Sequence, residues 1–134
     1  MIPAMFLAHL VGDYILQWNS LAAWKSREMK GVIVHCLVVL IVTWLFILPF
    51  NANWWPWVVF IGVMHFLIDA VQFRFKLPIP ELARFSLDQL AHFIVITVAL
   101  AGGGYLKLGA LLQTSQAVLQ SDLLLIYLLG YAFV

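Results

Sequence analysis

Long apolar runs separated by short polar stretches predict helices that cross a membrane. A transmembrane helix needs about 20 mostly apolar residues. Runs near this length cover residues 2–21, 31–50, 54–73 and 86–101. A glycine triplet ends the fourth run, and residues 123–134 form a further span only if its helix begins near Ser115. We therefore expect an all-α protein, a polytopic transmembrane bundle of four core helices plus a fifth.

The basic residues between these runs predict how the bundle is oriented. Six of the seven fall on one side, between the first and second runs or between the third and fourth: Lys25, Arg27, Lys30, Arg74, Lys76 and Arg84. The loop at residues 51–53 has no charge, and Lys107 is the seventh basic residue. Because lysine and arginine concentrate in cytoplasmic loops, we expect this side in the cytoplasm and the N-terminus outside.

Histidine and aspartate recur four residues apart inside the apolar runs. The pair in His65–Asp69 shares one face of a helix. The spacing is repeated in His9–Asp13 and, in reversed order, in Asp88–His92, while His35 lies near the start of the second run. Ionisable groups are costly in hydrocarbon, so these intramembrane residues predict a functional site.

The reversed order in the fourth run follows from its direction. The first and third spans run inward and the fourth runs outward, so aspartate must precede histidine there to stay on the cytoplasmic side. At 1.5 Å per residue, Asp69, Asp88 and His35 lie about 6–8 Å from the cytoplasmic boundary. His65 and His92 lie about 12–14 Å from it. We expect a deep histidine layer beneath an aspartate layer that opens to the cytoplasm.

The composition supports a membrane protein and limits the kinds of partner that we expect. The chain of 134 residues is 65% hydrophobic and 10% charged, with a mean hydropathy of +1.04, whereas a soluble domain has about 25% charged residues. We expect a single integral-membrane domain over residues 1–134, in contact with the lipid bilayer. A net charge of +1 gives no support for a nucleic-acid partner. The single cysteine, Cys36, excludes an intrachain disulfide and a cysteine-rich metal site.

A weak internal repeat divides the chain into two hairpins. An offset of 56 residues carries His9 and Asp13 onto His65 and Asp69, and carries His35 to within one position of His92. This pattern favours a parallel duplication of residues 1–50 and 54–101.

The same motifs carry a family resemblance. The ordered set His9-Leu-Val-Gly-Asp13-Tyr-Ile-Leu-Gln17, His35, His65-Phe-Leu-Ile-Asp69 and Leu-Asp88-Gln89-Leu-Ala-His92 resembles the bacterial membrane family catalogued as domain of unknown function 3307, over about residues 4–100. The resemblance implies a location in the bacterial inner membrane and the site positions, but no activity. More faintly, the chain is similar to predicted membrane-bound metal-dependent hydrolases, which also set histidines and aspartates in short apolar helices.

Imidazoles and carboxylates on facing helices suit a divalent ion such as zinc, iron or manganese. The candidate ligands are His9, Asp13, His35, His65, Asp69, Asp88 and His92. Gln17 and Gln89 are candidates for orienting those ligands through hydrogen bonds. No lysine or arginine lies in the spans, so the aspartates are expected to need a metal, protons or histidinium partners. A coordination position left open for water would allow hydrolysis of a membrane-proximal substrate.

A second hypothesis makes the protein a non-catalytic small subunit of a larger membrane complex or a homo-oligomer. The histidines would then pair structurally between helices or ligate a haem or chlorophyll. Cys36 is expected to face away from His35 and to be inert, since adjacent helix positions differ by about 100°.

The charge asymmetry yields a testable topology. Reporter fusions after Lys30 and Arg84 are expected to report the cytoplasm, and a fusion at Asn53 the outside, because basic loops stay cytoplasmic. Alkaline phosphatase and fluorescent-protein fusions measure this directly. The opposite pattern would overturn both the orientation and the layering.

Overall fold

The computed structural model of the protein describes residues 1–75, 78–107 and 109, and this part of the chain contains helices and no strand. The helices are α1 (Ile2–Leu10), the π-helical turn η1 (Val11–Ile15), α2 (Asn19–Lys25), α3 (Met29–Ile47), the 3-10 turn η2 (Ala52–Trp54), α4 (Trp55–Arg74) and α5 (Glu81–Gly102). The all-helical prediction is therefore confirmed. The fifth expected span, at residues 123–134, lies outside the described residues.

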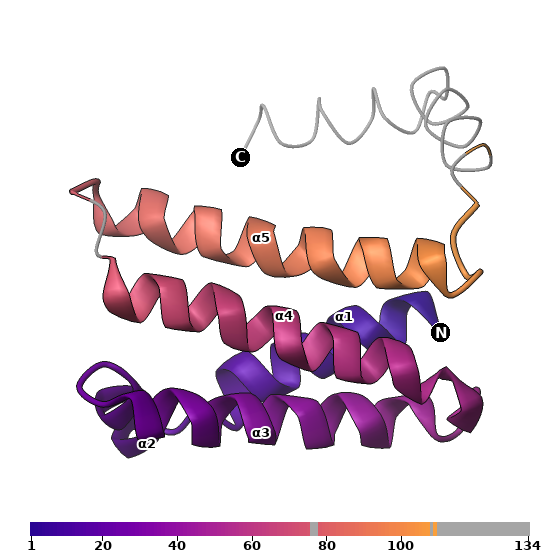
Figure 1. The fold of residues 1–134 in the computed structure, drawn as a ribbon, viewed down its shortest axis with the longest axis horizontal. Helices are drawn as coiled ribbons and strands as arrows, with labels where there is room; N and C mark the ends of the chain where they lie inside the picture. Colours follow the sequence, from indigo (N-terminus) through magenta and orange to yellow (C-terminus); the bar gives the residue numbers. More distant parts are fainter. Residues whose placement is uncertain (76–77, 108, 110–134) are drawn as a thin grey trace, which may run out of the picture.

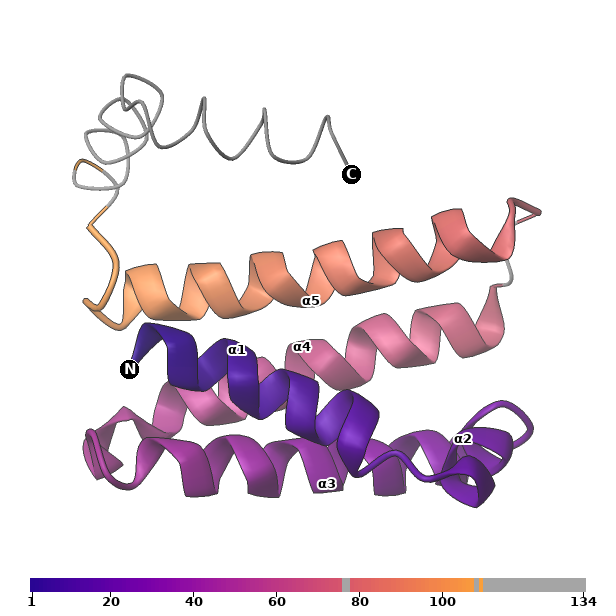
Figure 2. The same ribbon diagram turned by 180° about the vertical axis from the view of Figure 1, so that it is seen from behind.

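Three long helices form a layer, and α1 crosses one face of it. Helices α3, α4 and α5 follow one another side by side, and the view from behind shows α1 lying across them (Figures 1 and 2). Each is long and apolar enough to cross a membrane: Met29–Ile47, Ala52–Arg74 and Glu81–Gly102. These ranges agree with three of the four expected core spans.

The first span is shorter than its apolar run predicts. We expected it to reach residue 21, but the helix stops at Ile15 and the chain resumes helical structure at Asn19. Gln17, Trp18 and Asn19 interrupt the apolar sequence there, and asparagine is a poor residue for a helix interior. At 1.5 Å per residue, Ile2–Ile15 measures about 21 Å, less than the roughly 30 Å hydrocarbon core of a bilayer.

Helix α2 folds back against the start of α3. A Cβ atom on Gly31 would lie 2.5 Å from the backbone nitrogen of Lys25 and 2.5 Å from the carbonyl carbon of Trp24. Only glycine permits this approach. The Trp24 indole also donates to Glu28 Oε2 at 3.1 Å, which ties the α2–α3 turn together. We call this end of the bundle, with α2, the end of α4 and the start of α5, the basic end (Figure 1).

The opposite end holds the hydrophobic core. Its buried members come from α1, α3, α4 and α5 and the turn before α4: Met5, Ile47, Trp54, Val58, Ile61, Val95, Ile96, Ala99 and Leu100. The histidine and aspartate residues therefore lie between this hydrophobic core and the basic end.

The close approach at Gly31 predicts a local sensitivity. Gly31→Ala is expected to lower the free energy of unfolding by about 1–3 kcal/mol, because the new methyl group meets rigid backbone of α2. Thermal unfolding in detergent measures the loss.

Gly62→Ala on α4 is the matched control, since its methyl group meets only the mobile Cδ1 end of Leu40, at 2.6 Å. The control is expected to change stability by less than about 1 kcal/mol, because alanine also favours the helix. Equal losses in both variants would contradict the packing role of Gly31.

Candidate metal centre

The structure brings the four histidines together, one from each of α1, α3, α4 and α5. The ring centroids of His65 and His92 are 4.2 Å apart, those of His9 and His92 5.0 Å, and those of His35 and His65 5.3 Å. All four side chains are buried. The three aspartates lie within the same cluster, so the seven predicted residues converge.

Asp13, His35 and His65 form the first triad of this cluster. His35 Nε2 lies 3.0 Å from Asp13 Oδ1 and 3.2 Å from His65 Nε2, and His65 Nε2 lies 3.8 Å from Asp13 Oδ1. A tetrahedral ion with bonds of about 2.0–2.1 Å separates its ligand atoms by about 3.3–3.4 Å. The three separations bracket this value, so the first triad could hold a metal ion.

Asp69, Asp88 and His92 form the second triad, which shares no residue with the first. His92 Nδ1 lies 2.9 Å from the backbone oxygen of Asp88. A carbonyl oxygen only accepts, so Nδ1 carries the proton and Nε2 of the neutral ring carries the lone pair. That Nε2 is buried without a hydrogen-bond partner among the described residues, and it lies 3.9 Å from Asp69 Oδ1. Metal-binding histidines are held in this way.

Asp69 has a partner that the sequence analysis missed. Lys25 Nζ lies 2.7 Å from Asp69 Oδ2, which corrects the expectation that no cationic side chain reaches the aspartates. Lys25 is outside the apolar runs, but α2 packs against α3 and the flexible lysine stem carries the ammonium inward. The sequence signal that could have indicated this contact is the position of Lys25 shortly after an interrupted apolar run.

Cys36 also reaches this carboxylate. Its thiol donates to Asp69 Oδ2 at 3.8 Å, while His35 Nε2 lies 3.6 Å from the same atom. Cys36 therefore contacts the cluster, although it was expected to face a different side from His35 and to be inert. The two neighbours diverge around the helix, but Asp69 lies where α4 meets α3 and is within reach of both. Cys36, His65 and Asp69 form a third possible ligand group, which overlaps both triads.

The two predicted glutamines have different places. Gln89 accepts from His9 Nε2 at 3.2 Å and donates to Asp13 Oδ2 at 3.1 Å and to Asp88 Oδ2 at 3.3 Å. It thus connects both triads. Gln17 instead lines a cavity at the basic end. A third glutamine, Gln72, was not predicted and donates to Asp88 Oδ1.

His9 joins the cluster outside both triads. Its ring stacks on that of His92 with an interplanar angle of 23°, and its Nε2–H donates to Gln89. The expected histidine layer and aspartate layer are in direct contact, because each triad contains both histidine and aspartate side chains.

A polar cavity of about 290 Å³ reaches the cluster from the basic end. Its polar lining residues are Gln17, Lys25, Ser26, Asp69, Gln72 and Arg84. Asp69 belongs to both the cavity wall and the second triad, so the cavity ends at one of that triad's candidate ligands.

Comparison with known proteins identifies the family. The model of the family described as "Protein of unknown function (DUF3307)" matches residues 1–121, so the chain belongs to this family, as its motifs predicted. No curated protein and no solved structure matches the chain. The fainter similarity to metal-dependent hydrolases has no support from these comparisons.

The Lys25–Asp69 contact predicts a loss of stability when the cation is removed. In chelator-treated protein, Lys25→Met is expected to lower the free energy of unfolding by about 1–3 kcal/mol, because a buried carboxylate loses its partner. Thermal unfolding in detergent measures this. Lys30→Met, which removes an exposed lysine nearby, is the control, and an equal effect of the two changes would refute the pairing.

Proposed function

We propose that this DUF3307-family chain is an integral membrane protein that holds one or two divalent metal ions in its histidine–aspartate cluster and acts as a metal-dependent hydrolase. The observation that carries the proposal is the second triad. His92 Nε2 is a buried lone-pair donor without a described partner, and its other ring nitrogen is fixed by a backbone carbonyl. An unsatisfied buried polar atom is costly, and a bound cation satisfies it.

Outward-facing apolar side chains support the membrane location. Leu37 and Ile41 on α3, Val63 and Leu67 on α4, and Ile94 on α5 are each 47–58% exposed. Aliphatic surfaces on helices of spanning length fit lipid rather than water. We place the protein in the bacterial inner membrane with its basic end toward the cytoplasm, following the positive-inside rule.

The types of ligand atom limit which metal ions are suitable. Asp13, His35 and His65 would hold one ion, and Asp69, Asp88 and His92 would hold a second. Nitrogen and carboxylate donors fit zinc, iron or manganese. Three protein ligands leave a position open, as in catalytic rather than structural zinc sites. When bound, such an ion supplies Lewis acidity toward water and toward a carbonyl or phosphoryl oxygen.

The chain's own polar groups would position the reactants. Gln89 holds Asp13 and Asp88, and Gln72 holds Asp88, so three carboxylate oxygens have fixed directions. The polar cavity admits substrate and water from the basic end. Hydrolysis of an ester there consumes one water, which gives its hydroxyl to the acyl carbon or phosphorus and its second proton to the leaving oxygen.

The alternative is a non-catalytic subunit whose histidines pair structurally. One observation favours it: Asp69 already pairs with Lys25 and Asp13 with His35, so part of the network is satisfied by protein groups alone. A tetrapyrrole fits less well, because imidazole rings with centroids 4.2–5.7 Å apart leave no room for a macrocycle between them. Partner subunits or self-association belong to this alternative.

Metal content separates the two functions. Purified parent protein is expected to contain zinc, iron or manganese in stoichiometric amounts, and His65→Gln and His92→Gln are each expected to lose most of the ion in their triad, because each ligand closes part of the coordination sphere. Elemental analysis by plasma mass spectrometry measures this.

His9→Gln is the matched control, since His9 lies in neither triad. It is expected to retain its metal. A parent protein without metal, together with an unchanged melting temperature in His65→Gln, would reject the metal centre in favour of tolerant structural pairing.

A further inference from the structure

We propose that the substrate of this site is a lipid with a phosphate headgroup, its phosphate in the polar cavity and one acyl chain in an apolar groove between α3 and α4. The proposal rests on the proposed function, because it names the substrate class for the same cluster. Three features of the structure support it: the charge of the cavity, the position of the groove, and the contact between them.

The polar cavity has the donors that a phosphate requires. Arg84 supplies a positive charge, Lys25 supplies a second that is balanced by its contact with Asp69, and Gln17 supplies a neutral amide donor. Ser26 and Gln72 also line the cavity, where they donate to Ala23 O and Asp88 Oδ1. Among the described residues, no carboxylate lies within ion-pair distance of Arg84, so its guanidinium is available to an anion. Arginine and lysine form charge-assisted hydrogen bonds to phosphate oxygens, which accept several at once.

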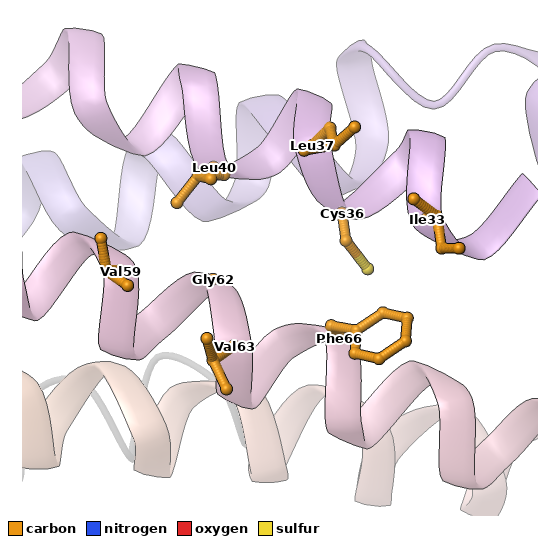
Figure 3. Close-up of a pocket in the computed structure, with 8 residues that line it drawn as sticks. All are labelled: Ile33, Cys36, Leu37, Leu40, Val59, Gly62, Val63 and Phe66. Carbon is orange, nitrogen blue, oxygen red and sulfur yellow. The ribbon is translucent and has the colours of Figure 1, made fainter. Parts of the chain in front are cut away.

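The apolar groove lies along the α3–α4 contact. Figure 3 shows its eight lining residues: Ile33, Cys36, Leu37, Leu40, Val59, Gly62, Val63 and Phe66. Its volume is about 330 Å³, within the range of ligand pockets of about 300–1,000 Å³. Gly62 has no side chain to fill it, and Leu37 and Val63 are half exposed at its sides. The groove therefore opens to whatever surrounds the helices.

The walls of the groove and the cavity touch at one contact. Cys36 lines the groove and Asp69 lines the cavity, and Cys36 Sγ lies 3.8 Å from Asp69 Oδ2. From Ile33 to Leu40 the groove extends along α3 for about 10 Å at 1.5 Å per residue, away from the basic end. A polar pocket at the basic end and an apolar groove leading from it match the two halves of a phospholipid.

The length of the helices, which is sufficient to span a membrane, favours an acyl chain as the occupant of the groove. In the bilayer proposed for this chain, acyl chains surround α3 and α4. A lipid headgroup would then lie at the basic end, where the helices leave the hydrocarbon core. The Arg84 charge selects an anionic headgroup over a neutral one. Asp69 lines the cavity and belongs to the second triad, so the phosphate would lie beside that triad.

Lipid binding to the purified full-length protein in dodecyl maltoside tests the proposal. Native mass spectrometry with dioctanoyl phosphatidic acid, dioctanoylglycerol and inorganic phosphate as separate probes is expected to show phosphatidic acid bound most tightly. Arg84→Gln is expected to weaken that binding by about tenfold or more, through loss of a charge-assisted contact. Arg74→Gln, an exposed arginine that does not line the cavity, is the matched control and is expected to bind normally.

A second pair of variants tests the groove. Val63→Trp fills it and is expected to weaken binding of phosphatidic acid but not of inorganic phosphate, whereas Leu67→Trp places the same side chain on the same helix outside the groove. Inorganic phosphate bound as tightly as phosphatidic acid, with no effect of Val63→Trp, would show a site for free phosphate and overturn the proposal. Absence of phosphatidic acid binding would also overturn it.

Metal analysis of the same samples keeps the two proposals separate. Metal-loaded protein that fails to bind phosphatidic acid contradicts the lipid substrate alone. Metal-free protein that binds phosphatidic acid supports the lipid site and contradicts the hydrolase. Arg84→Gln is expected to keep the metal content of the parent, because Arg84 belongs to neither triad.

Discussion

The Asp69 carboxylate is buried between apolar helices, and an isolated charge there would be costly to the fold. Five side chains surround it: Lys25 from α2, His35 and Cys36 from α3, His65 one turn earlier on α4, and His92 from α5. Helix α2 must fold back for the lysine to arrive, which requires the close approach at Gly31. The local geometry of the basic end thus follows from the need to neutralise one side chain.

The two ends of the bundle serve different purposes. Aliphatic and aromatic packing around Ile96 and Leu100 supplies a dry core at the far end, where α1 joins α3, α4 and α5. Near the basic end the same four helices present ionisable groups, with the π-helical turn η1 beginning two residues after His9. Such turns occur often at functional sites because they change the direction of a side chain within a helix. Here the turn contains Asp13, a member of the first triad.

The sequence predicts three spans and the cluster positions well, because long apolar runs and a four-residue spacing leave few alternatives. The convergence of His65 and His92 follows from their places on adjacent antiparallel helices. The break after Ile15 was not predicted, since hydropathy averaged over a run hides three polar or interfacial residues. Lys25 and Gln72 were missed because hydropathy cannot tell a lysine that folds inward from one in water, or an interior amide from an interfacial one. The exclusion of His9 from both triads depends on ring orientation, which no spacing specifies.

The central claim is that the two triads hold metal ions. Anomalous diffraction from crystals of the purified protein, recorded at the zinc, iron and manganese absorption edges, tests it most directly because it locates each ion among named side chains. The expected result is one anomalous peak within about 2.0–2.2 Å of the ligand atoms of His35 and His65 and a second peak beside His92. Ordered density for all seven side chains without any anomalous peak, in crystals grown with these metals present, would contradict it.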